Sequence, residues 1–418
     1  MRVFVKTSGC RLNRAESCRF EAEFAAAGCE TVPLGAACDV VLFHTCVVTA
    51  AAEKECLRLI RAQRKKTPGA LLAVSGCATA LIPSESLQAA GADLIIPQDQ
   101  KDEAVRLILR HTGTAATDVP PAALPPSRSL SRALLKVQDG CDFFCAYCIV
   151  PYTRGRPRSL PPDKCLEKAR ALIDAGFQEI VVTGCNLACY QHTGMGLIDL
   201  LAALADLPGL GRLRVGSVEP GTVELELARL MAHTGNICRF LHLPIQSADD
   251  AVLARMGRRY TADAMARTLS EIIRLVPDAG LGTDIITGFP SETDAAFRNT
   301  RDFLNAFPFN NLHVFPYSER PGTSAVNFEG AVAVAERRER ARQLIALGAD
   351  LRHQDALRRV ERPTEVLVER FDKRGLAHGW SGEYLPCAIR RVPRDRLQKL
   401  VTFVPERAEG ETLCGALP

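Results

Sequence analysis

The chain has 418 residues, of which 47% are hydrophobic and 24% are charged, and its formal net charge is +4. At roughly 150 residues per domain this length predicts two or three domains, and the composition excludes disordered, collagen-like and coiled-coil proteins. The small positive charge neither requires nor excludes a polyanionic partner. Its apolar runs are far shorter than the ~20 residues that cross a bilayer. The first residues lack the features of a secretory signal, so we expect a cytoplasmic protein with no membrane partner.

Residues 1–111 predict an α/β domain built on a parallel sheet. Strand-like segments alternate with helical patterns, a succession typical of strands joined by helical crossovers. The expected strands lie near 2–7, 39–45, 70–76 and 92–97, and the expected helices near 15–27 and 51–66. Residues 112–131 are rich in proline, alanine, serine and threonine, and we expect them to form a linker.

Residues 132–359 predict a partial parallel (β/α)6 barrel with a trailing helix. Its six strand-like segments lie at 133–138, 179–184, 212–217, 240–245, 280–287 and 311–315. In such barrels the chemistry lies at the C-terminal ends of the strands. A charged helix is expected near 333–360. Short β-type runs in residues 360–418 predict a small C-terminal β-barrel.

The strongest chemical signal is a run of three cysteines, Cys141, Cys145 and Cys148, directly after the first predicted barrel strand. Three thiolates within eight residues suit an iron–sulfur cluster, and they leave one iron of a four-iron cluster without a protein ligand. A structural zinc site is the main alternative, but it commonly needs four protein ligands in paired half-sites, and no second pair lies nearby. Cysteines that serve only as small core residues are the other alternative.

Three further cysteines, Cys10, Cys46 and Cys77, each follow a predicted strand of the N-terminal sheet. Because the carboxyl ends of parallel strands meet at one edge of a sheet, these distant residues are expected to converge. Together they would form a second three-thiolate site. The alternative is that they are small residues at tight turns.

The segment GCDFFCAYCIVPYTRGRPRS resembles the cluster motif of radical S-adenosylmethionine (SAM) enzymes. With the N-terminal cysteines, nearly the whole chain resembles the methylthiotransferases of that superfamily. Further matching segments, in chain order, are TGCNLACY, RVGSVEP, LHLPIQS, RMGRRYT, DIITGFPSET and VFPYSERPGT. The resemblance implies a methylthiotransferase N-terminal domain, a radical SAM barrel and a TRAM-like β-barrel.

The same resemblance implies two [4Fe-4S] clusters. The first, on Cys141, Cys145 and Cys148, would bind SAM and cleave it reductively to a 5′-deoxyadenosyl radical, which makes these cysteines catalytic as well. The second, on Cys10, Cys46 and Cys77, would supply sulfur, and a second SAM would supply the methyl group. Such an enzyme needs an electron donor of the flavodoxin or ferredoxin type and a sulfur donor that the sequence does not identify.

The segments GCRLNRAES and TCVVTAAAEK most resemble the enzymes that methylthiolate C2 of N6-threonylcarbamoyladenosine just 3′ of the tRNA anticodon. The expected partner is therefore a tRNA anticodon stem-loop. Alternative substrates within the family are N6-isopentenyladenosine in tRNA and an aspartate of a ribosomal protein. Outside the family, an iron–sulfur electron carrier and a zinc-stabilised RNA-binding module stay open.

Polar residues at the predicted barrel strand ends are candidates to bind SAM, which carries an ammonium, a sulfonium, a carboxylate and ribose hydroxyls. They are Thr183, Gly184, Ser217, Glu219 and Gln246, with Asp284 as a weaker candidate. Ordinary strand-end hydrogen bonding is the alternative role for each of them.

Three arginines after the cluster motif, Arg154, Arg156 and Arg158, suit contacts with RNA phosphates. Their alternative role is in internal salt bridges that hold the cluster loop. The chain also departs from the family at His44, where asparagine is usual, and at Cys185 and Cys189, which are usually not cysteines. We expect His44 to pack beside the cluster and the two cysteines not to be ligands.

Overall fold

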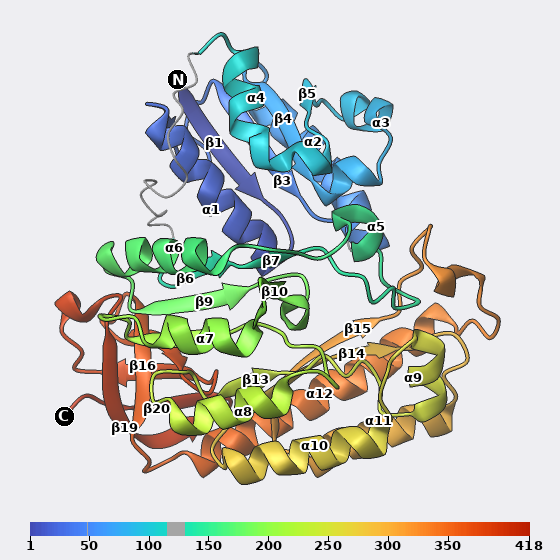
Figure 1. Cartoon of the computed structure of the whole chain (residues 1–418), viewed down its shortest axis with the longest axis vertical. Helices are drawn as coiled ribbons and strands as arrows, with labels where there is room; N and C mark the ends of the chain where they lie inside the picture. The colour runs from blue at the N-terminus through green and yellow to red at the C-terminus, as the bar shows by residue number, and fades with distance from the viewer. Residues whose placement is uncertain (48, 115–129) are drawn as a thin grey trace.

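The computed structural model describes residues 1–47, 49–114 and 130–418 (Figure 1). Most of the predicted linker lies outside these residues. No helix among them combines the length and the apolar character needed to span a bilayer.

The N-terminal segment forms a five-stranded parallel sheet in the order β2-β1-β3-β4-β5. Its strands are β1 (Arg2–Thr7), β2 (Glu30–Thr31), β3 (Val40–Thr45), β4 (Leu71–Gly76) and β5 (Leu94–Ile95). The helices are α1 (Arg11–Ala26), α2 (Ala50–Lys66), α3 (Ser84–Ala89) and α4 (Ala104–His111). Strand β3 is buried along its whole length because apolar clusters lie on both faces of the sheet. The predicted parallel α/β fold is confirmed here, with the short β2 in addition.

The central segment is a partial barrel of six parallel strands in two groups of three, ordered β12-β9-β6 and β13-β14-β15. Isolated bridges, one of them between Ser217 and His242, join the two groups. The strands are β6 (Ala133–Lys136), β9 (Glu179–Thr183), β12 (Arg212–Val215), β13 (Phe240–His242), β14 (Gly280–Thr287) and β15 (Phe309–Pro316). All six follow the predicted segments.

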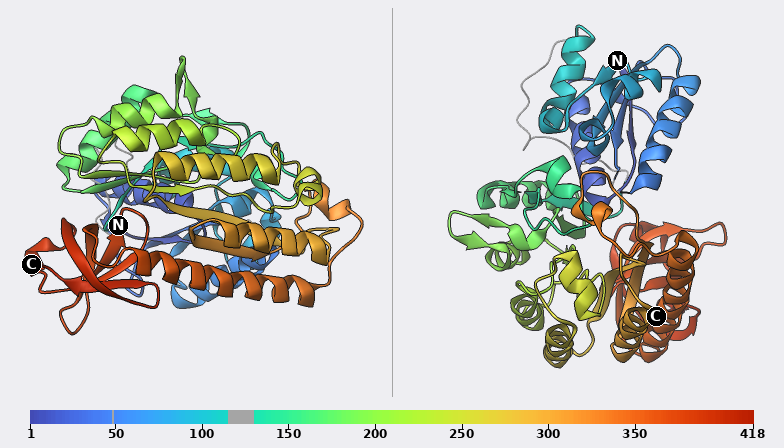
Figure 2. Two further views of the ribbon diagram at one scale, coloured as in Figure 1. Left: turned by 90° about the horizontal axis from the view of Figure 1, so that it is seen from below. Right: turned by 90° about the vertical axis from the view of Figure 1, so that its right-hand side faces the viewer.

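Eight helices accompany these strands among the described residues: α5 (Val150–Arg154), α6 (Pro162–Asp174), α7 (Leu197–Ala205), α8 (Glu224–His233), α9 (Asp250–Met256), α10 (Ala262–Leu275), α11 (Asp294–Ala306) and α12 (Val334–Arg358). Alternate strand residues, such as Leu135, Val182 and Leu213, join the core under the helices. Because side chains alternate across a strand, the residues between them point into the barrel. In Figure 2 the long helix α12 leads into the C-terminal segment.

The C-terminal segment is a closed five-stranded barrel in the order β16-β17-β18-β20-β19. Its strands are β16 (Thr364–Phe371), β17 (Ala377–Ser381), β18 (Pro386–Arg390), β19 (Leu400–Glu409) and β20 (Thr412–Ala416). The predicted small β-barrel is therefore confirmed. Strand β20 was not among the predicted runs, because its five residues include Gly415 and little β-branched sequence.

A buried ionic group attaches this barrel to the partial barrel. Glu179 accepts hydrogen bonds from the Nε atoms of Arg212 and Arg214, both at 2.7 Å. The same guanidiniums donate to the main-chain oxygens of Trp380 and Ser381 at 2.8 Å. The turn after β17 is therefore held through charges that belong to the partial barrel.

We expect Glu179→Gln to cost about 3 kcal/mol of stability at neutral pH, because it leaves two buried guanidiniums without their anion. Burial raises the pKa of Glu179, but Arg214 and Arg212 outweigh burial and lower it to about 2. The contribution of Glu179 is therefore complete above its unfolded pKa near 4.5 and is lost as the pH falls toward 2. Urea unfolding of both proteins between about pH 2.5 and pH 7 should show a difference that is nearly constant above about pH 5 and shrinks as the pH falls further. A difference that stays constant with pH would contradict this assignment.

Candidate active site between two cysteine triads

The structure brings Cys10, Cys46 and Cys77 together at the carboxyl edge of the N-terminal sheet. Cys10 is the N-cap of α1, Cys46 follows β3, and Cys77 follows β4. A hydrogen bond from the Cys46 thiol lowers the pKa of Cys10 to about 6. Burial raises the pKa of Cys77, whose thiol also contacts Arg154. We call these three residues the N-terminal triad.

Gly9 allows this convergence because its backbone lies against Cys46. It has a φ of +96°, and a Cβ placed on it would lie 2.0 Å from the Cys46 Cβ and 2.6 Å from its Sγ. Only glycine adopts this conformation at low cost, and any side chain here displaces Cys46.

We expect Gly9→Ala to remove most of the iron bound by the N-terminal triad, besides lowering stability by at least ~1 kcal/mol. Gly28→Ala is the matched control, because Gly28 also has a positive φ (+75°) but has open space around its missing Cβ. Iron content after anaerobic reconstitution measures the effect. Equal iron loss in both variants would show that backbone strain, and not the contact with Cys46, is responsible.

The second group, Cys141, Cys145 and Cys148, lies in the loop between β7 (Gln138–Asp139) and α5. We call it the barrel triad. Asn186 Nδ2 donates to the Cys141 Sγ at 3.7 Å, and a hydrogen bond with the Cys189 thiol lowers the pKa of Cys141 to about 6. Burial raises the pKa of Cys148 to about 12.

The structure does not bring the sulfurs of either triad as close together as the ligands of a single ion. Zinc–sulfur bonds of about 2.3 Å require ligand atoms close to one another. In the part of the chain that the structure describes, neither triad has its three sulfurs within 4.8 Å of each other. That each triad holds a four-iron cluster stays a prediction.

Arg258 connects the barrel triad to a candidate SAM-binding residue. Its guanidinium donates to the Cys145 Sγ at 3.4 Å and pairs with Glu219 Oε1 at 2.7 Å. Burial raises the pKa of Glu219 to about 7 although Arg258 opposes this shift. The sequence analysis did not select Arg258, although it lies in the RMGRRYT segment, because only the fold places it beside Cys145.

The other candidate SAM residues surround the same strand ends. Thr183 and Gln246 are buried, and Ser217 is exposed. Gly184 has no room for a side chain, since a Cβ there would lie 2.9 Å from Gln138 Oε1. Their contacts with SAM stay a prediction.

The structure corrects the prediction that Arg154 contacts RNA. Its side chain is only 3% exposed, and its guanidinium donates to Glu16, Asp139 and Asn13 at 2.5–3.1 Å. Arg154 therefore has the alternative role that the sequence left open, which is to form internal salt bridges. Arg156 and Arg158 are exposed, and RNA contacts stay a prediction for these two alone.

Arg154 is part of a buried group that we call the interdomain charge cluster: Glu16, Lys101, Lys136, Asp139 and Arg154. Lys136 Nζ donates to Glu16 Oε1 at 2.5 Å and to Asp139 Oδ2 at 2.7 Å, and Lys101 pairs with the same two carboxylates. Burial raises the pKa of Glu16, but His44 and the surrounding cations together lower it well below its usual value. The cluster joins α1 to the first strands of the partial barrel.

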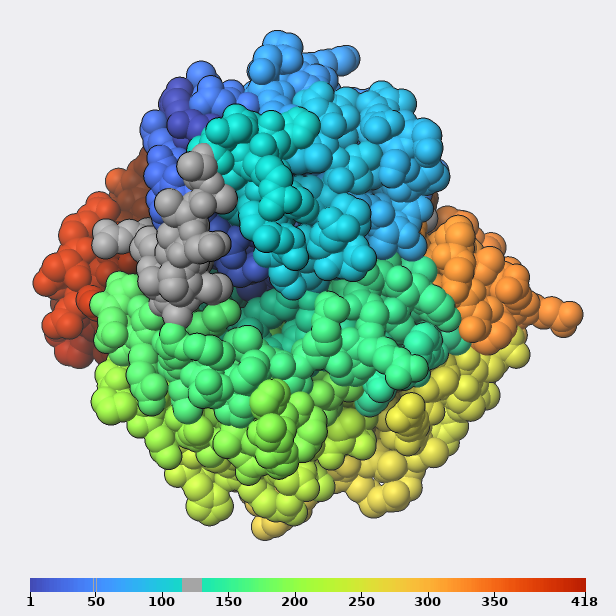
Figure 3. All heavy atoms as spheres, turned by 45° about the horizontal axis from the view of Figure 1, so that its top comes forward, coloured from blue at the N-terminus to red at the C-terminus, as the bar shows by residue number. Residues whose placement is uncertain are grey.

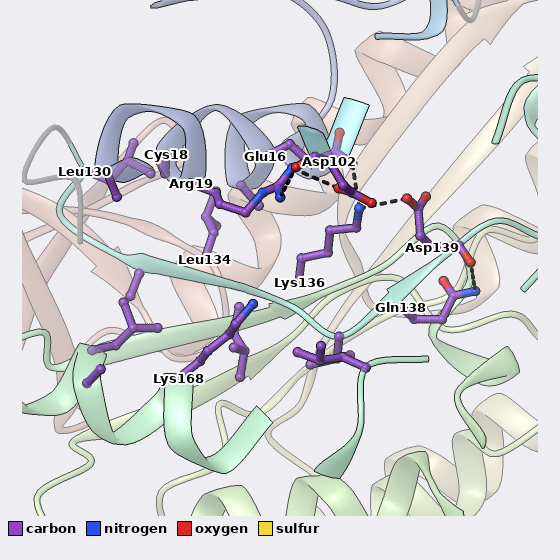
Figure 4. Close-up of a pocket in the computed structure, with 18 of the residues that line it drawn as sticks. Glu16, Cys18, Arg19, Asp102, Leu130, Leu134, Lys136, Gln138, Asp139 and Lys168 are labelled. Carbon is purple, nitrogen blue, oxygen red and sulfur yellow. Dashed lines mark hydrogen bonds and ion pairs between the residues drawn. The ribbon is translucent and has the colours of Figure 1, made fainter. Parts of the chain in front are cut away.

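A cavity of about 470 Å³ lies beside this cluster, between α1, β6 and α6 (Figure 4). Figure 4 shows Glu16, Lys136 and Asp139 next to one another at its inner side, with Lys168 across from α1. In Figure 3 the N-terminal domain, in blue to cyan, and the green start of the partial barrel meet along a hollowed seam. The junction therefore combines the interdomain charge cluster with apolar residues such as Leu134 and Leu135, which also line the cavity.

His44 is buried next to Glu16, two residues before Cys46, and its packing beside a cluster stays a prediction. Its Nε2 lies 2.9 Å from Glu16 Oε2, and its ring is completely buried. Burial lowers the pKa of His44, which keeps the ring neutral. Its Nδ1 has no hydrogen-bond partner among the described residues.

Cys185 and Cys189 lie between the two triads. Cys185 Sγ donates to Asp139 Oδ1 at 3.3 Å, whereas Cys189 contacts Cys141. Burial raises the pKa of Cys185 far above its usual value. That neither of them is a metal ligand stays a prediction.

Two family models match the chain. The model of the Radical SAM superfamily matches residues 135–304, and that of an uncharacterised protein family, UPF0004, matches residues 2–97. Among solved structures, the radical SAM methyltransferase TsrM from Kitasatospora setae superposes with a TM-score of 0.59 at 15% identity, covering 78% of this chain and 76% of that one. The partial barrel, its cysteine triad and these matches define a radical SAM protein.

Curated relatives identify the family. The chain is 30% identical over 417 residues to the threonylcarbamoyladenosine tRNA methylthiotransferase MtaB of Bacillus subtilis, covering 96% of this chain and 92% of the relative. It is 32% identical to the Thermotoga maritima protein of the same name, with coverages of 92% and 90%. It is 34% identical to the tRNA-2-methylthio-N(6)-dimethylallyladenosine synthase of Roseobacter denitrificans, with 88% of each chain covered. The chain belongs to the radical SAM methylthiotransferase family.

Proposed function

We propose that this protein methylthiolates C2 of N6-threonylcarbamoyladenosine in the anticodon stem-loop of tRNA. The single observation that carries the proposal is the presence of two cysteine triads on either side of the interdomain charge cluster. A methylthiotransferase needs two such sites, one for SAM cleavage and one for sulfur. Four relatives named for this activity, 29–32% identical over most of the chain, support the choice of substrate.

The enzyme uses SAM and two [4Fe-4S] clusters. The barrel triad would hold the cluster that binds SAM, and the N-terminal triad would hold the second cluster. When bound, these groups would supply the reductive cleavage of SAM and the sulfur atom. This chemistry is needed because the target C–H bond is unactivated, and acid–base catalysis by side chains does not break such a bond at neutral pH.

The chain's own residues fix and enclose this site. The guanidinium of Arg258 contacts both Glu219 and Cys145. It therefore fixes the candidate SAM-binding carboxylate of Glu219 relative to Cys145, the predicted cluster ligand. Asn186 donates to Cys141 of the same triad. Arg154 links the two domains, because its guanidinium contacts both Cys77 of the N-terminal domain and Asp139 of the partial barrel.

The finer partners belong to the same proposal. The cluster chemistry requires one-electron reduction, which a protein of the flavodoxin or ferredoxin type supplies. The exposed Arg156 and Arg158 would contact RNA phosphates. A sulfur donor is also required.

The test is turnover of tRNA by anaerobically reconstituted enzyme with SAM and a chemical reductant. Nucleosides from the digested tRNA are identified by mass spectrometry. We expect 2-methylthio-N6-threonylcarbamoyladenosine from tRNA that carries the threonylcarbamoyl base. Product from dimethylallyladenosine tRNA only would overturn the proposed substrate. SAM cleavage without any methylthiolated nucleoside would overturn the proposed reaction.

A further inference from the structure

Three side chains that the proposed chemistry does not use, those of His242, Asp284 and His313, form a compact group inside the partial barrel. Asp284 Oδ1 lies 3.0 Å from His242 Nε2 and 3.0 Å from His313 Nδ1, and the two imidazole centroids are 5.2 Å apart. They come from the adjacent strands β13, β14 and β15. We call them the imidazole–carboxylate group.

This group faces the interior of the barrel. The neighbouring residues Leu241, Leu281 and Ile285 belong to the core under the helices, so that His242 and Asp284 point the opposite way. The main-chain oxygen of Asp284 accepts a hydrogen bond from the Gln246 amide at 2.9 Å. The group therefore lies directly beside a candidate SAM residue.

His313 is the most exposed member of the group. Asp284 is 27% exposed and accepts a hydrogen bond from each ring, which places the proton of His242 on Nε2 and that of His313 on Nδ1. The His242 side chain is 8% exposed, and its Nδ1 packs against Gly282, where a Cβ would lie 2.7 Å away. His313 is 49% exposed, and its Nε2 has no hydrogen bond to any described residue. Asp284 and His242 orient the ring that presents this nitrogen.

The two kinds of relative act on bases that differ in the substituent on N6. In adenine, C2 and C6 flank N1, so that a substituent on N6 lies on the same edge as the reacting carbon. A protein group that reads this substituent must therefore lie next to the reaction site. The threonylcarbamoyl substituent has a hydroxyl, N–H groups and a carboxylate, whereas the dimethylallyl substituent is a hydrocarbon. An imidazole nitrogen can form a hydrogen bond with the threonylcarbamoyl substituent, but it has no partner when the dimethylallyl substituent lies beside it.

We propose that His313, positioned by Asp284 and His242, contacts the N6 substituent and selects the threonylcarbamoyl base over the dimethylallyl base. This inference rests on the proposed function and names the residue that sets its specificity. Its Nε2 accepts from the hydroxyl or an N–H of the substituent, and in the protonated ring it donates to the carboxylate.

The test compares anticodon stem-loops that carry threonylcarbamoyl-, dimethylallyl- or unsubstituted adenosine. We expect His313→Leu in the reconstituted enzyme to weaken binding of the threonylcarbamoyl stem-loop roughly tenfold, as the loss of one good hydrogen bond predicts. The same variant should bind the unsubstituted stem-loop as the wild type does. The ratio of kcat/KM for the two modified substrates should shift toward dimethylallyladenosine by at least the same factor.

Three further variants separate recognition from a structural role. His313→Gln keeps a hydrogen-bonding end and should restore part of the preference, and Asp284→Asn should shift the substrate ratio in the same direction as His313→Leu. His233→Leu is the matched control, since His233 ends helix α8, is exposed and hydrogen-bonds the main-chain oxygen of Arg229. Iron content and the unfolding midpoint identify variants that fail to fold. If His313→Leu is one of them, the substrate ratio of His313→Gln decides the test.

An unchanged substrate ratio in His313→Leu would overturn the inference while leaving the proposed function intact. A wild-type enzyme that methylthiolates neither stem-loop would overturn the proposed function instead. Bound metal beyond the cluster iron, lost in His313→Leu, would also overturn the inference, because three such ligands within 4.8 Å suit a single ion.

Discussion

Replacing Cys10, Cys46 and Cys77 together by alanine is expected to lower the iron content of the reconstituted protein from about eight to about four atoms per chain. The physical reason is that each triad would hold its own cluster, on ligands from separate domains. The barrel triad keeps Asn186 and Arg258 as neighbours in the variant, so its iron should stay bound. SAM cleavage should persist, whereas methylthiolation of tRNA should fall below detection. Iron and acid-labile sulfide analysis measures the first effect, and nucleoside mass spectrometry the second.

The matched control replaces three buried cysteines that belong to no triad, Cys29, Cys165 and Cys238. Their loss should lower stability by small cavity effects and leave about eight irons in place. About four irons in both the wild type and the triad variant would mean that the N-terminal cysteines are structural. The protein would then be a radical SAM enzyme without a sulfur-supplying cluster.

Replacing Arg154 by methionine is expected to destabilise the protein by about 3 kcal/mol and to loosen the junction between the N-terminal domain and the partial barrel. The change removes the Arg154 hydrogen bonds to the buried oxygens of Glu16, Asp139 and Asn13. The interdomain charge cluster contains the cations Lys101, Lys136 and Arg154 against the carboxylates of Glu16 and Asp139. Arg154 also contacts Cys77 and acts to lower the pKa of its thiol, so that its positive charge favours a thiolate there.

For this reason Arg154→Met should also reduce iron retention at the N-terminal triad. Urea unfolding and the rate of iron release to a chelator are the measurements. Arg156→Met is the control, because Arg156 is only two residues away but exposed, and it should change neither quantity. If Arg154→Met weakened tRNA binding while stability and iron retention stayed the same, the internal role assigned here would be wrong.

The features that the sequence predicted are those that depend on local patterns. The strands of both sheets follow from short apolar runs between turns, and the barrel triad from a spacing of a few residues. Convergence of Cys10, Cys46 and Cys77 was predictable because parallel strands end at a common edge, a rule that needs only the strand order. Strand β20 was not predicted because its pairing with β18 and β19, and not its amino-acid composition, makes it a strand.

The features that escaped depend on contacts between residues far apart in the chain. Arg154 looked like an RNA contact because a run of three arginines is usually solvated, yet Glu16, 138 residues earlier, buries one of them. Arg258 and Cys145, and likewise His242, Asp284 and His313, become neighbours only when the partial barrel closes. The short motifs in the sequence thus indicated the family by resemblance, and the positions of the cysteines after predicted strands predicted two thiolate sites, because both are local signals. Which charges are buried, and which imidazole is exposed, was decided only by tertiary packing, because burial and electrostatic pairing are properties of the folded environment.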